Sequence, residues 1–440
     1  MTPIFELWTL LTRSREHMAA SEWVTLYEDD VTNHGFAAPV SDDENPLVSQ
    51  SLFDEKRRET TQYWLKTLPE AIIPRLFAVL SGTHPTLLSH GLMIAYFLRG
   101  DPIILSGSIP GVSAPTIQAL AKINASLREC HLKDLNKISD DVFASLFSKL
   151  SMCEILVLKG STKVGKKSID AIANTCKHLR VLNLNFTSAP PASIAFLTGE
   201  CIELEILKLA GISLINDGSF ADILHISDDS GIPLRRLRRL KLRHTSITNQ
   251  SLKWIGSICI HLTHLDVSFT PIKQPLSLCD SSTFIPELEK LSLTSTPLTP
   301  TFLLRVQTNV LLDSPLKFLR TLHIGAIGAS PSPRIRSTPD SLTLTDDVLD
   351  SLTDALYECK LLENVLNLAA ISRLTSSDLS GLPPVEHFTD EIGDDPAVYE
   401  ASPLQTLNIN NTAVDNEAAE YIATCPGLQI LNLAGTKLDC

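Results

Sequence analysis

A short run of leucines that recurs at nearly constant spacing organises this chain. Residues 179–184 read L-x-x-L-x-L, and residues 204–209 repeat the pattern 25 residues later. Such a run predicts a short strand. Apolar residues then recur at helical spacing, most clearly over 251–259 and 417–425. Each unit is therefore predicted to be a strand, a turn and a helix.

The same unit can be followed from residue 102 to residue 440. Its predicted first positions are Pro102, Leu127, Cys153, Leu179, Leu204, Leu237, Leu262, Leu288, Leu319, Leu362, Leu404 and Leu428. Six of the eleven intervals are 25 or 26 residues, and the longer ones predict inserted loops at about 213–234, 328–345 and 381–403. One unit alone cannot bury its leucines, whereas stacked units share a continuous core. The predicted fold class is α/β, a curved leucine-rich-repeat solenoid with parallel strands inside and helices outside.

Two of the predicted units fit the pattern poorly. The first, at Pro102, is expected to act as a terminal cap. In the unit at Leu362 the leucines are displaced by one residue, which puts Asn367 where an apolar residue belongs. Either a bulge lies there or the unit begins at another residue.

The ninth position of the unit is predicted to be structural. It holds a hydroxyl residue in seven units, namely Ser161, Thr187, Thr245, Thr270, Thr296, Thr412 and Thr436. A hydroxyl where the strand turns away can hydrogen-bond the backbone of the turn and of the neighbouring coil. The column is expected to satisfy buried polar groups, and no catalytic threonine is predicted.

A column of cysteines precedes the first leucine of the next unit by three residues. Its members are Cys176, Cys201, Cys259, Cys359 and Cys425. A thiol at the end of a helix behaves as a small hydrophobe, so these cysteines are expected to be buried and free. The chain has nine cysteines and no C-x-x-C pair. An odd number in a large core favours reduced thiols in an intracellular compartment.

With this column, C-x-x-L-x-x-L at a period of 25–26 residues resembles the cysteine-containing class of leucine-rich repeats, within the ribonuclease-inhibitor-like superfamily. That class is typical of F-box/LRR proteins, of the mitotic-exit antagonist family and of a yeast nucleotide-excision-repair factor. The resemblance covers residues 102–440. It implies a substrate receptor of an SCF-type ubiquitin ligase.

Three segments are predicted before the solenoid. Residues 1–28 form an amphipathic helix, 29–52 an acidic, proline-broken linker and 53–101 a small helical domain. Pro69 and Glu70 suit the first turn of a helix. Its expected apolar face is Ile72, Ile73, Leu76, Phe77 and Leu80, and another helix is expected over 85–98.

The same segment is similar to the opening of an F-box. The matching residues are Leu68, Pro69, Glu70, Ile73, Phe77 and Leu80. The second half departs, because an F-box usually continues with a helix containing Cys or Trp, and residues 86–100 have neither. Two interpretations stay open. One is a degenerate F-box that binds a Skp-type adaptor through Leu68, Pro69, Ile73, Phe77 and Leu80. The other is a helical cap that shields the core of the first coil.

Side chains at the third, fifth and seventh positions are expected to face the concave surface. Across eleven units, leaving out the one at Leu362, seven of them are basic and two are acidic, whereas the whole chain carries −13. This contrast predicts a basic strip for an acidic or phosphorylated protein segment. A solvated charged face is the other interpretation. The predicted partner-binding residues are Lys159, Lys208, Arg239, Lys241, Arg243, His264 and Lys290.

Charge and motif content restrict the function. The net charge of −13 argues against bulk binding of nucleic acid or anionic membranes. The most apolar run, residues 87–105, is interrupted by Arg99, Gly100 and Asp101, so no membrane span is predicted. The chain lacks a P-loop and the H-E-x-x-H and G-x-S-x-G motifs. No catalytic residue, metal or cofactor is therefore predicted, and the expected location is the cytoplasm or the nucleus.

The sequence thus predicts a non-enzymatic protein-binding receptor, an F-box/LRR-like substrate adaptor in SCF-type ubiquitin-dependent degradation. The alternative is a scaffold subunit of a nuclear complex, for DNA repair or assembly, without ligase association.

The strand at Leu428 has no helix after it. The chain is therefore expected to continue beyond Cys440, or to have its last leucine row covered by a partner or by residues 381–403.

Overall fold

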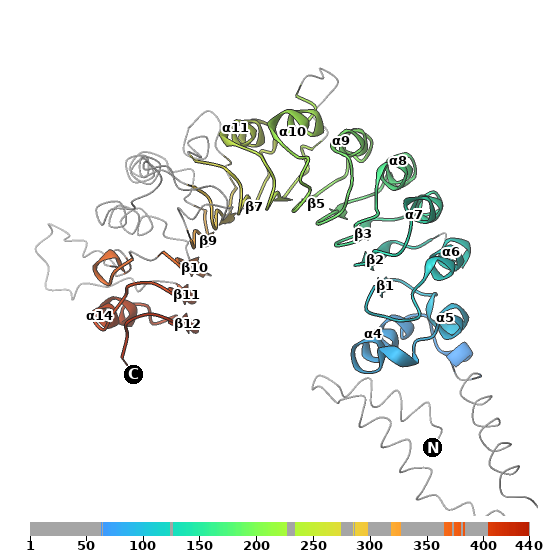
Figure 1. Cartoon of the computed structure of the whole chain (residues 1–440), viewed down its shortest axis with the longest axis horizontal. Coiled ribbons are helices and arrows are strands. Elements are labelled where there is room, and N and C mark those ends of the chain that lie inside the picture. The colour runs from blue at the N-terminus through green and yellow to red at the C-terminus, as the bar shows by residue number, and fades with distance from the viewer. Residues whose placement is uncertain are drawn as a thin grey trace, which may run out of the picture.

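The computed structural model describes residues 63, 65–123, 126–226, 234–273, 285, 287–297, 318–326, 365–371, 374–379, 382 and 404–439. They form an arc with strands on its inner side and helices on its outer side (Figure 1). The predictions for 1–28, 29–52, 328–345 and Cys359, and for 381–403 apart from residue 382, lie outside the described residues. Among the described helices, none combines the length and the hydropathy that a membrane span requires.

Every strand pairs in parallel with the next strand along the chain, so one sheet lines the inside of the arc. The strands are β1 (Ile103–Ser106), β2 (Glu129–Lys133), β3 (Ile155–Val157), β4 (Val181–Asn183), β5 (Ile206–Lys208), β6 (Arg239–Lys241), β7 (His264–Asp266), β8 (Lys290–Ser292), β9 (Thr321–His323), β10 (Val365–Asn367), β11 (Thr406–Asn408) and β12 (Ile430–Asn432).

Helices cover the opposite side of the sheet. After β1 they are α6 (Ala114–Ile123), α7 (Asp140–Phe147), α8 (Lys166–Thr175), α9 (Pro191–Glu200), α10 (Asp217–Ile223), α11 (Asn249–Ile258), η4 (Ser377–Leu379) and α14 (Ala418–Ala423). The helices before β1 lie at the first end of the arc (Figure 1) and are α4 (Ile73–Thr83), η1 (Pro85–Leu87), α5 (His90–Leu92) and η2 (Met93–Phe97). The predicted insert at 213–234 therefore includes α10, the outer helix of its own unit. The predicted α/β leucine-rich-repeat solenoid is confirmed.

The fourth position of the unit builds the core. Leu182 on β4 pairs with Leu207 on β5, which pairs with Leu240 on β6, and all three are buried. The column continues to Leu431 on the last described strand, which is 38% exposed. Stacking therefore removes each leucine row from water through its neighbours on both sides.

Strand pairing corrects two of the predicted unit starts. Ile103 pairs with Cys130, which is the fourth residue of its unit, so the first unit begins two residues before Pro102. Leu366 pairs with both Leu322 and Leu407, so the later unit begins one residue after Leu362. The register passes through β10 without a shift, and Asn367 takes a fifth, inward-facing position. The two predicted starts were wrong because the register is set by the residue that is buried at the fourth position. This residue is Ile103 in the first unit and Leu366 in the later one.

The eighth position has a left-handed backbone along most of the solenoid. It is Gly160, Gly211 and Gly435 in three units, and a residue with a side chain at Asp134, Phe186, His244, Phe269, Ser295, Ala326, Ala370 and Asn411, with φ between 52° and 75° in all of them. This conformation directs the amide toward the next unit: the Phe186 N–H donates to the Ala210 carbonyl at 2.7 Å. Each turn is thereby fixed to its neighbour.

The ninth-position hydroxyls take the structural role predicted for them. The six threonines each donate to the carbonyl three residues earlier, at 2.5–2.8 Å. Ser161 instead donates to the Leu132 carbonyl of the preceding unit at 2.9 Å and accepts from the Leu135 N–H at 3.0 Å. These bonds satisfy backbone groups that the turns would otherwise bury unpaired.

The cysteine column is buried and free at Cys176, Cys201, Cys259 and Cys425, as predicted. The Cys176 thiol donates to the Leu150 carbonyl of the preceding unit at 3.2 Å. Burial raises the pKa of Cys201 to about 11 and that of Cys259 to about 12. Both thiols therefore stay protonated at neutral pH and act as packing groups.

The helical segment before the solenoid differs in detail from its prediction. Helix α4 begins at Ile73, and Pro74 rather than Pro69 occupies its first turn. The single helix expected over 85–98 is divided into 3-10, α and π turns. Pro85 starts the first of these, and the hydroxyl of Ser89 caps the second. A proline and a capping serine so close together interrupt a regular helix.

Aspartates at the start of two outer helices fasten them to the next helix. The Asp140 carboxylate accepts from the Gly165 and Lys167 N–H groups, at 2.8 and 3.0 Å, and from the Ser168 hydroxyl and N–H. The Asp217 carboxylate likewise accepts from Thr248 at 2.8 and 2.6 Å and from the Ser251 hydroxyl. An acceptor there satisfies free N–H groups and complements the positive end of the helix.

We predict that Asp140→Asn lowers the free energy of unfolding by about 1.5–3 kcal/mol, the range for hydrogen bonds to a charged group. Burial raises the pKa of Asp140, but its hydrogen bonds outweigh burial and hold the pKa below its ordinary value. This stabilisation is therefore present above the unfolded pKa of about 3.9 and is lost as the pH falls through the folded value. Urea unfolding at pH 7 and pH 3 measures both effects.

Asp141→Asn is the matched control. Asp141 is adjacent, its side chain is 71% exposed, and its ion pair with Lys167 is at the surface. Such pairs contribute less than about 1 kcal/mol. Equal losses of stability in the two variants would contradict the role assigned to Asp140.

Candidate functional site

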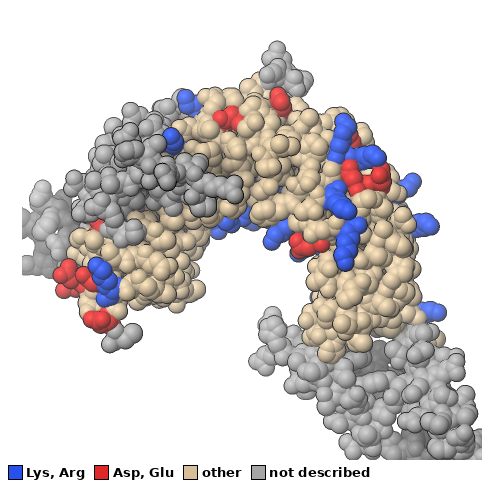
Figure 2. All heavy atoms as spheres, in the orientation of Figure 1, with Lys and Arg blue, Asp and Glu red and all other residues tan. Residues whose placement is uncertain are grey.

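The basic residues predicted for the concave face form two rows across β5 to β9. The third-position row is Arg239, His264 and Lys290, and the fifth-position row is Lys208, Lys241, Asp266, Ser292 and His323. Neighbouring strands lie about 4.8 Å apart, well within the Debye length of physiological salt. Figure 2 shows Lys and Arg atoms along the inner side of the arc. The charges therefore act on a bound group together.

These side chains line a hollow of about 490 Å³ in the concave surface. Arg243, Ser268, Phe269 and Thr294 close it on the side where the strands turn outward. We call this site the basic hollow. Its lining combines cations, hydroxyl groups, two imidazoles and one phenylalanine ring, which suits an elongated polar ligand better than a small apolar one.

Only part of the positive charge in the basic hollow is neutralised within it. Asp266 pairs with Lys241 at 3.0 Å and lies 4.0 Å from the Nε of Arg243. Lys208, Arg239 and Lys290 have no carboxylate partner within the described part of the chain. Three cations are therefore available to an anionic ligand.

Burial and the neighbouring positive charges of Lys241 and Arg239 lower the pKa of Lys208. The protonated form of Lys208 is thus held in an unfavourable field. An anion bound among these three side chains relieves that repulsion, so charge and burial together favour an occupied site.

Two histidines in the basic hollow are mainly neutral at pH 7. Burial lowers the pKa of His264, and Arg239 and Lys290 lower it further, whereas Glu289 raises it. Burial also lowers the pKa of His323, with Lys290 in the same direction and Asp266 opposed. Protonation below pH 6.5 would add positive charge where lysine and arginine are already concentrated.

An aromatic stack borders the basic hollow. The rings of His244 and Phe269 lie 4.3 Å apart and nearly parallel, and the Arg243 guanidinium is 5.1 Å from the Phe269 ring centre. The Nε of Arg243 is buried and has no hydrogen-bond partner in the described part of the chain. The stack orients Arg243 at the edge of the site through a cation–π contact.

The structure brings together six of the seven predicted partner-binding residues. Lys208, Arg239, Lys241, Arg243, His264 and Lys290 line the basic hollow. Lys159 is exposed just after β3 and is not among the lining residues.

The predicted adaptor-binding residues have mixed accessibility. Leu68, Ile73 and Phe77 are buried in the core, and Leu80 packs against it, whereas Pro69 is exposed. Phe77 contacts Phe97 with ring centres 5.6 Å apart, and both residues lie beside β1. The buried side chains thus cover the apolar end of the first coil.

Sequence reasoning missed Asp266 as a neutralising group and His323 as a lining residue. It also missed two aromatic residues on the concave face, the exposed Phe186 and the half-buried Phe269. The available signal was positional, because both phenylalanines occupy the eighth position of their unit. Within the described residues, no group of three His, Cys, Asp or Glu side chains is arranged to hold a metal ion.

No protein-family model and no curated protein matches the chain. Similar solved structures include an internalin from Listeria monocytogenes, at 17% identity over 76% of this chain and 86% of that chain, with a TM-score of 0.40. The yeast Rad7 and Elc1 complex is similar at 16% identity, 94% and 98% coverage and a TM-score of 0.48. A Leptospira interrogans leucine-rich-repeat protein has 15% identity, 76% and 84% coverage and a TM-score of 0.40.

We predict that His264 and His323 titrate below pH 6.5 and that Lys290→Gln raises the pKa of both, because it removes a nearby positive charge. NMR titration of the histidine ring protons measures the two values. Lys163→Gln, at an exposed position elsewhere, is the control. Histidine pKa values that do not move in Lys290→Gln would show that these charges are not coupled.

Proposed function

We propose that this chain is a non-enzymatic receptor whose concave face binds an acidic or phosphorylated segment of another protein. The single observation that carries the proposal is a set of cations on the wall of one hollow that have no carboxylate partner among the described residues, namely Lys208, Arg239 and Lys290. Lysine and arginine without carboxylate partners are costly to gather on neighbouring strands, and they form charge-assisted hydrogen bonds with carboxylates or phosphates.

The rigid sheet supports this proposal physically. The cations are on strands held in register from β5 to β9, so little backbone ordering accompanies binding. Complementary charge steers an acidic segment toward the site and disfavours basic ones. The cation Lys241, already paired with Asp266, fixes the geometry of the floor rather than adding free charge.

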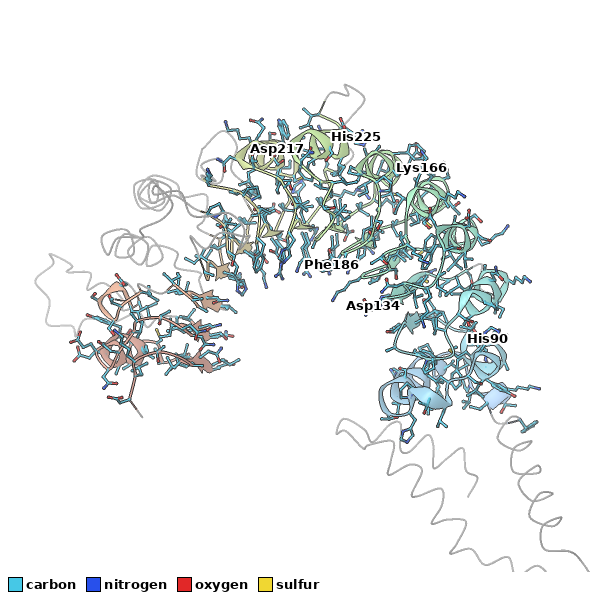
Figure 3. The ribbon with its side chains drawn as sticks, in the orientation of Figure 1. His90, Asp134, Lys166, Phe186, Asp217 and His225 are labelled. Carbon is cyan, nitrogen blue, oxygen red and sulfur yellow. The ribbon has the colours of Figure 1, made fainter. Side chains whose placement is uncertain are left out.

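We predict that Lys208→Glu or Arg239→Glu weakens the binding of a fluorescein-labelled polyglutamate peptide, and of a phosphoserine-containing peptide, by about tenfold or more. This is the fold-change for about 1.4 kcal/mol. Fluorescence anisotropy at low and physiological salt measures the affinities. The control is Lys166→Glu, on the outer side of the arc, where the Lys166 side chain is 75% exposed (Figure 3). Wild-type affinity in the inner-face variants would refute the proposal.

Delivery of the bound protein to a ubiquitin ligase is a further part of the proposal. The helical segment resembles an F-box opening, and it leaves Val79 and Leu87 exposed by 42% and 57%. The basic hollow would hold the substrate while the helical segment before β1 holds a Skp-type adaptor, so proximity is the whole mechanism. A scaffold subunit of a nuclear complex without ligase association is the alternative.

We predict that the full chain co-purifies with a co-expressed Skp-type adaptor and that Val79→Asp reduces this, because it places a charge on the exposed side of α4. Met152→Asp, at a residue 44% exposed outside the helical segment, is the control. Quantitative co-purification measures both. A well-folded full chain that retains no adaptor would argue for the scaffold alternative.

A further inference from the structure

Two phenylalanines lie at the surface in a backbone conformation that does not favour them: Phe186 is exposed and Phe269 is half-buried. Phe186 and Phe269 both have left-handed φ values, 57° and 59°. For a residue with a side chain this conformation costs about 1–2 kcal/mol. Phe186 is also 46% exposed, and it lies on the inner side of the arc (Figure 3).

The fold itself does not require an aromatic residue at this position. The same eighth position is occupied by Gly160 and Gly435, and by the small side chains of Ser295 and Ala326, with the same backbone conformation. The turn therefore forms without a ring. A strained aromatic residue that solvent or a ligand can reach, at a position that accepts glycine, points to a role in binding.

Each of the two rings has a defined support. The Phe186 ring lies over Gly211 in the next unit, where any Cβ would collide with it. Phe269 is held by the stacked His244 ring and by Arg243, and it forms part of the wall of the basic hollow. The two rings are therefore placed by their neighbours along the same rim of the concave face.

The spacing of the rings suits an extended peptide. Phe186 follows β4 and Phe269 follows β7, so three strand intervals separate them, roughly 14 Å at about 4.8 Å each. Four residues of an extended chain span about 13 Å, and side chains four residues apart point to the same face. The cations of β5 and β6 lie between the two rings along the sheet.

We propose that Phe186 and Phe269 bind two aromatic side chains, four residues apart, of an extended acidic segment whose carboxylates face the basic hollow. This assignment rests on the proposed function and adds a specificity determinant to it. Single-stranded nucleic acid also stacks on aromatic residues. A nucleic acid carries a charge on every nucleotide, whereas a peptide can place an uncharged residue opposite the Asp266 carboxylate inside the hollow, so this carboxylate favours a peptide.

The experiment compares two labelled glutamate-rich peptides of identical composition by fluorescence anisotropy. One carries tyrosines four residues apart and the other three residues apart, which places the rings on opposite faces. We expect the first to bind about tenfold more tightly, and the double variant Phe186→Ala/Phe269→Ala to lose this preference while keeping the weaker binding common to both peptides. Phe196→Ala, which removes a 43% exposed ring on the outer helix α9, should keep the preference.

A second variant separates binding from folding. Phe186→Gly relieves the left-handed strain, so its melting temperature should not fall, and it should still lose affinity for the first peptide. If both peptides bind equally tightly, and Lys208→Glu weakens the binding of both, the aromatic assignment is overturned and the proposed function stands. No binding of either peptide would overturn both proposals. Tighter binding of oligo-dT, lost in the phenylalanine variants, would assign the rim to nucleic acid and overturn the peptide proposal.

Discussion

A single unit of this chain has too little apolar surface to be stable, and the whole structure depends on how units share it. Parallel strand pairing fixes each unit to the next, and the left-handed eighth residue returns the backbone toward its neighbour at most of the turns. Because the register is the same from strand to strand, each sequence position becomes a column. The buried leucines, the ninth-position hydroxyls and the inward-facing cations are all consequences of that one register.

The columns explain what could be predicted from the sequence. A leucine at a buried position leaves a periodic signal, so most units and the burial of Cys176 and Cys259 could be read directly. The prediction failed where the signal was weak. At Leu362, a leucine one residue out of register matched the pattern. At Pro102, the apolar residues that set the register are the isoleucines and the leucine of the strand that follows.

The candidate site could be predicted only in part, for a different physical reason. That Arg239, Lys241 and Lys208 face the same surface follows from strand alternation. Whether each is neutralised depends on contacts between units, as with Asp266 and Lys241, and sequence spacing does not encode these contacts. The exposed Phe186 and the half-buried Phe269 could not be recognised, because an apolar residue next to a leucine run is normally taken as core. Their backbone conformation is what distinguishes them.

The uniform register also has an evolutionary consequence. A third- or fifth-position side chain contacts the solvent and its neighbours in the same row, while the backbone beneath it is held by the leucine and hydroxyl columns. Substitution at one inward-facing position therefore changes the local chemistry of the surface without altering the path of the chain. Selection can revise the recognition surface one residue at a time, and duplication of a whole unit lengthens that surface while preserving the geometry of what is already there.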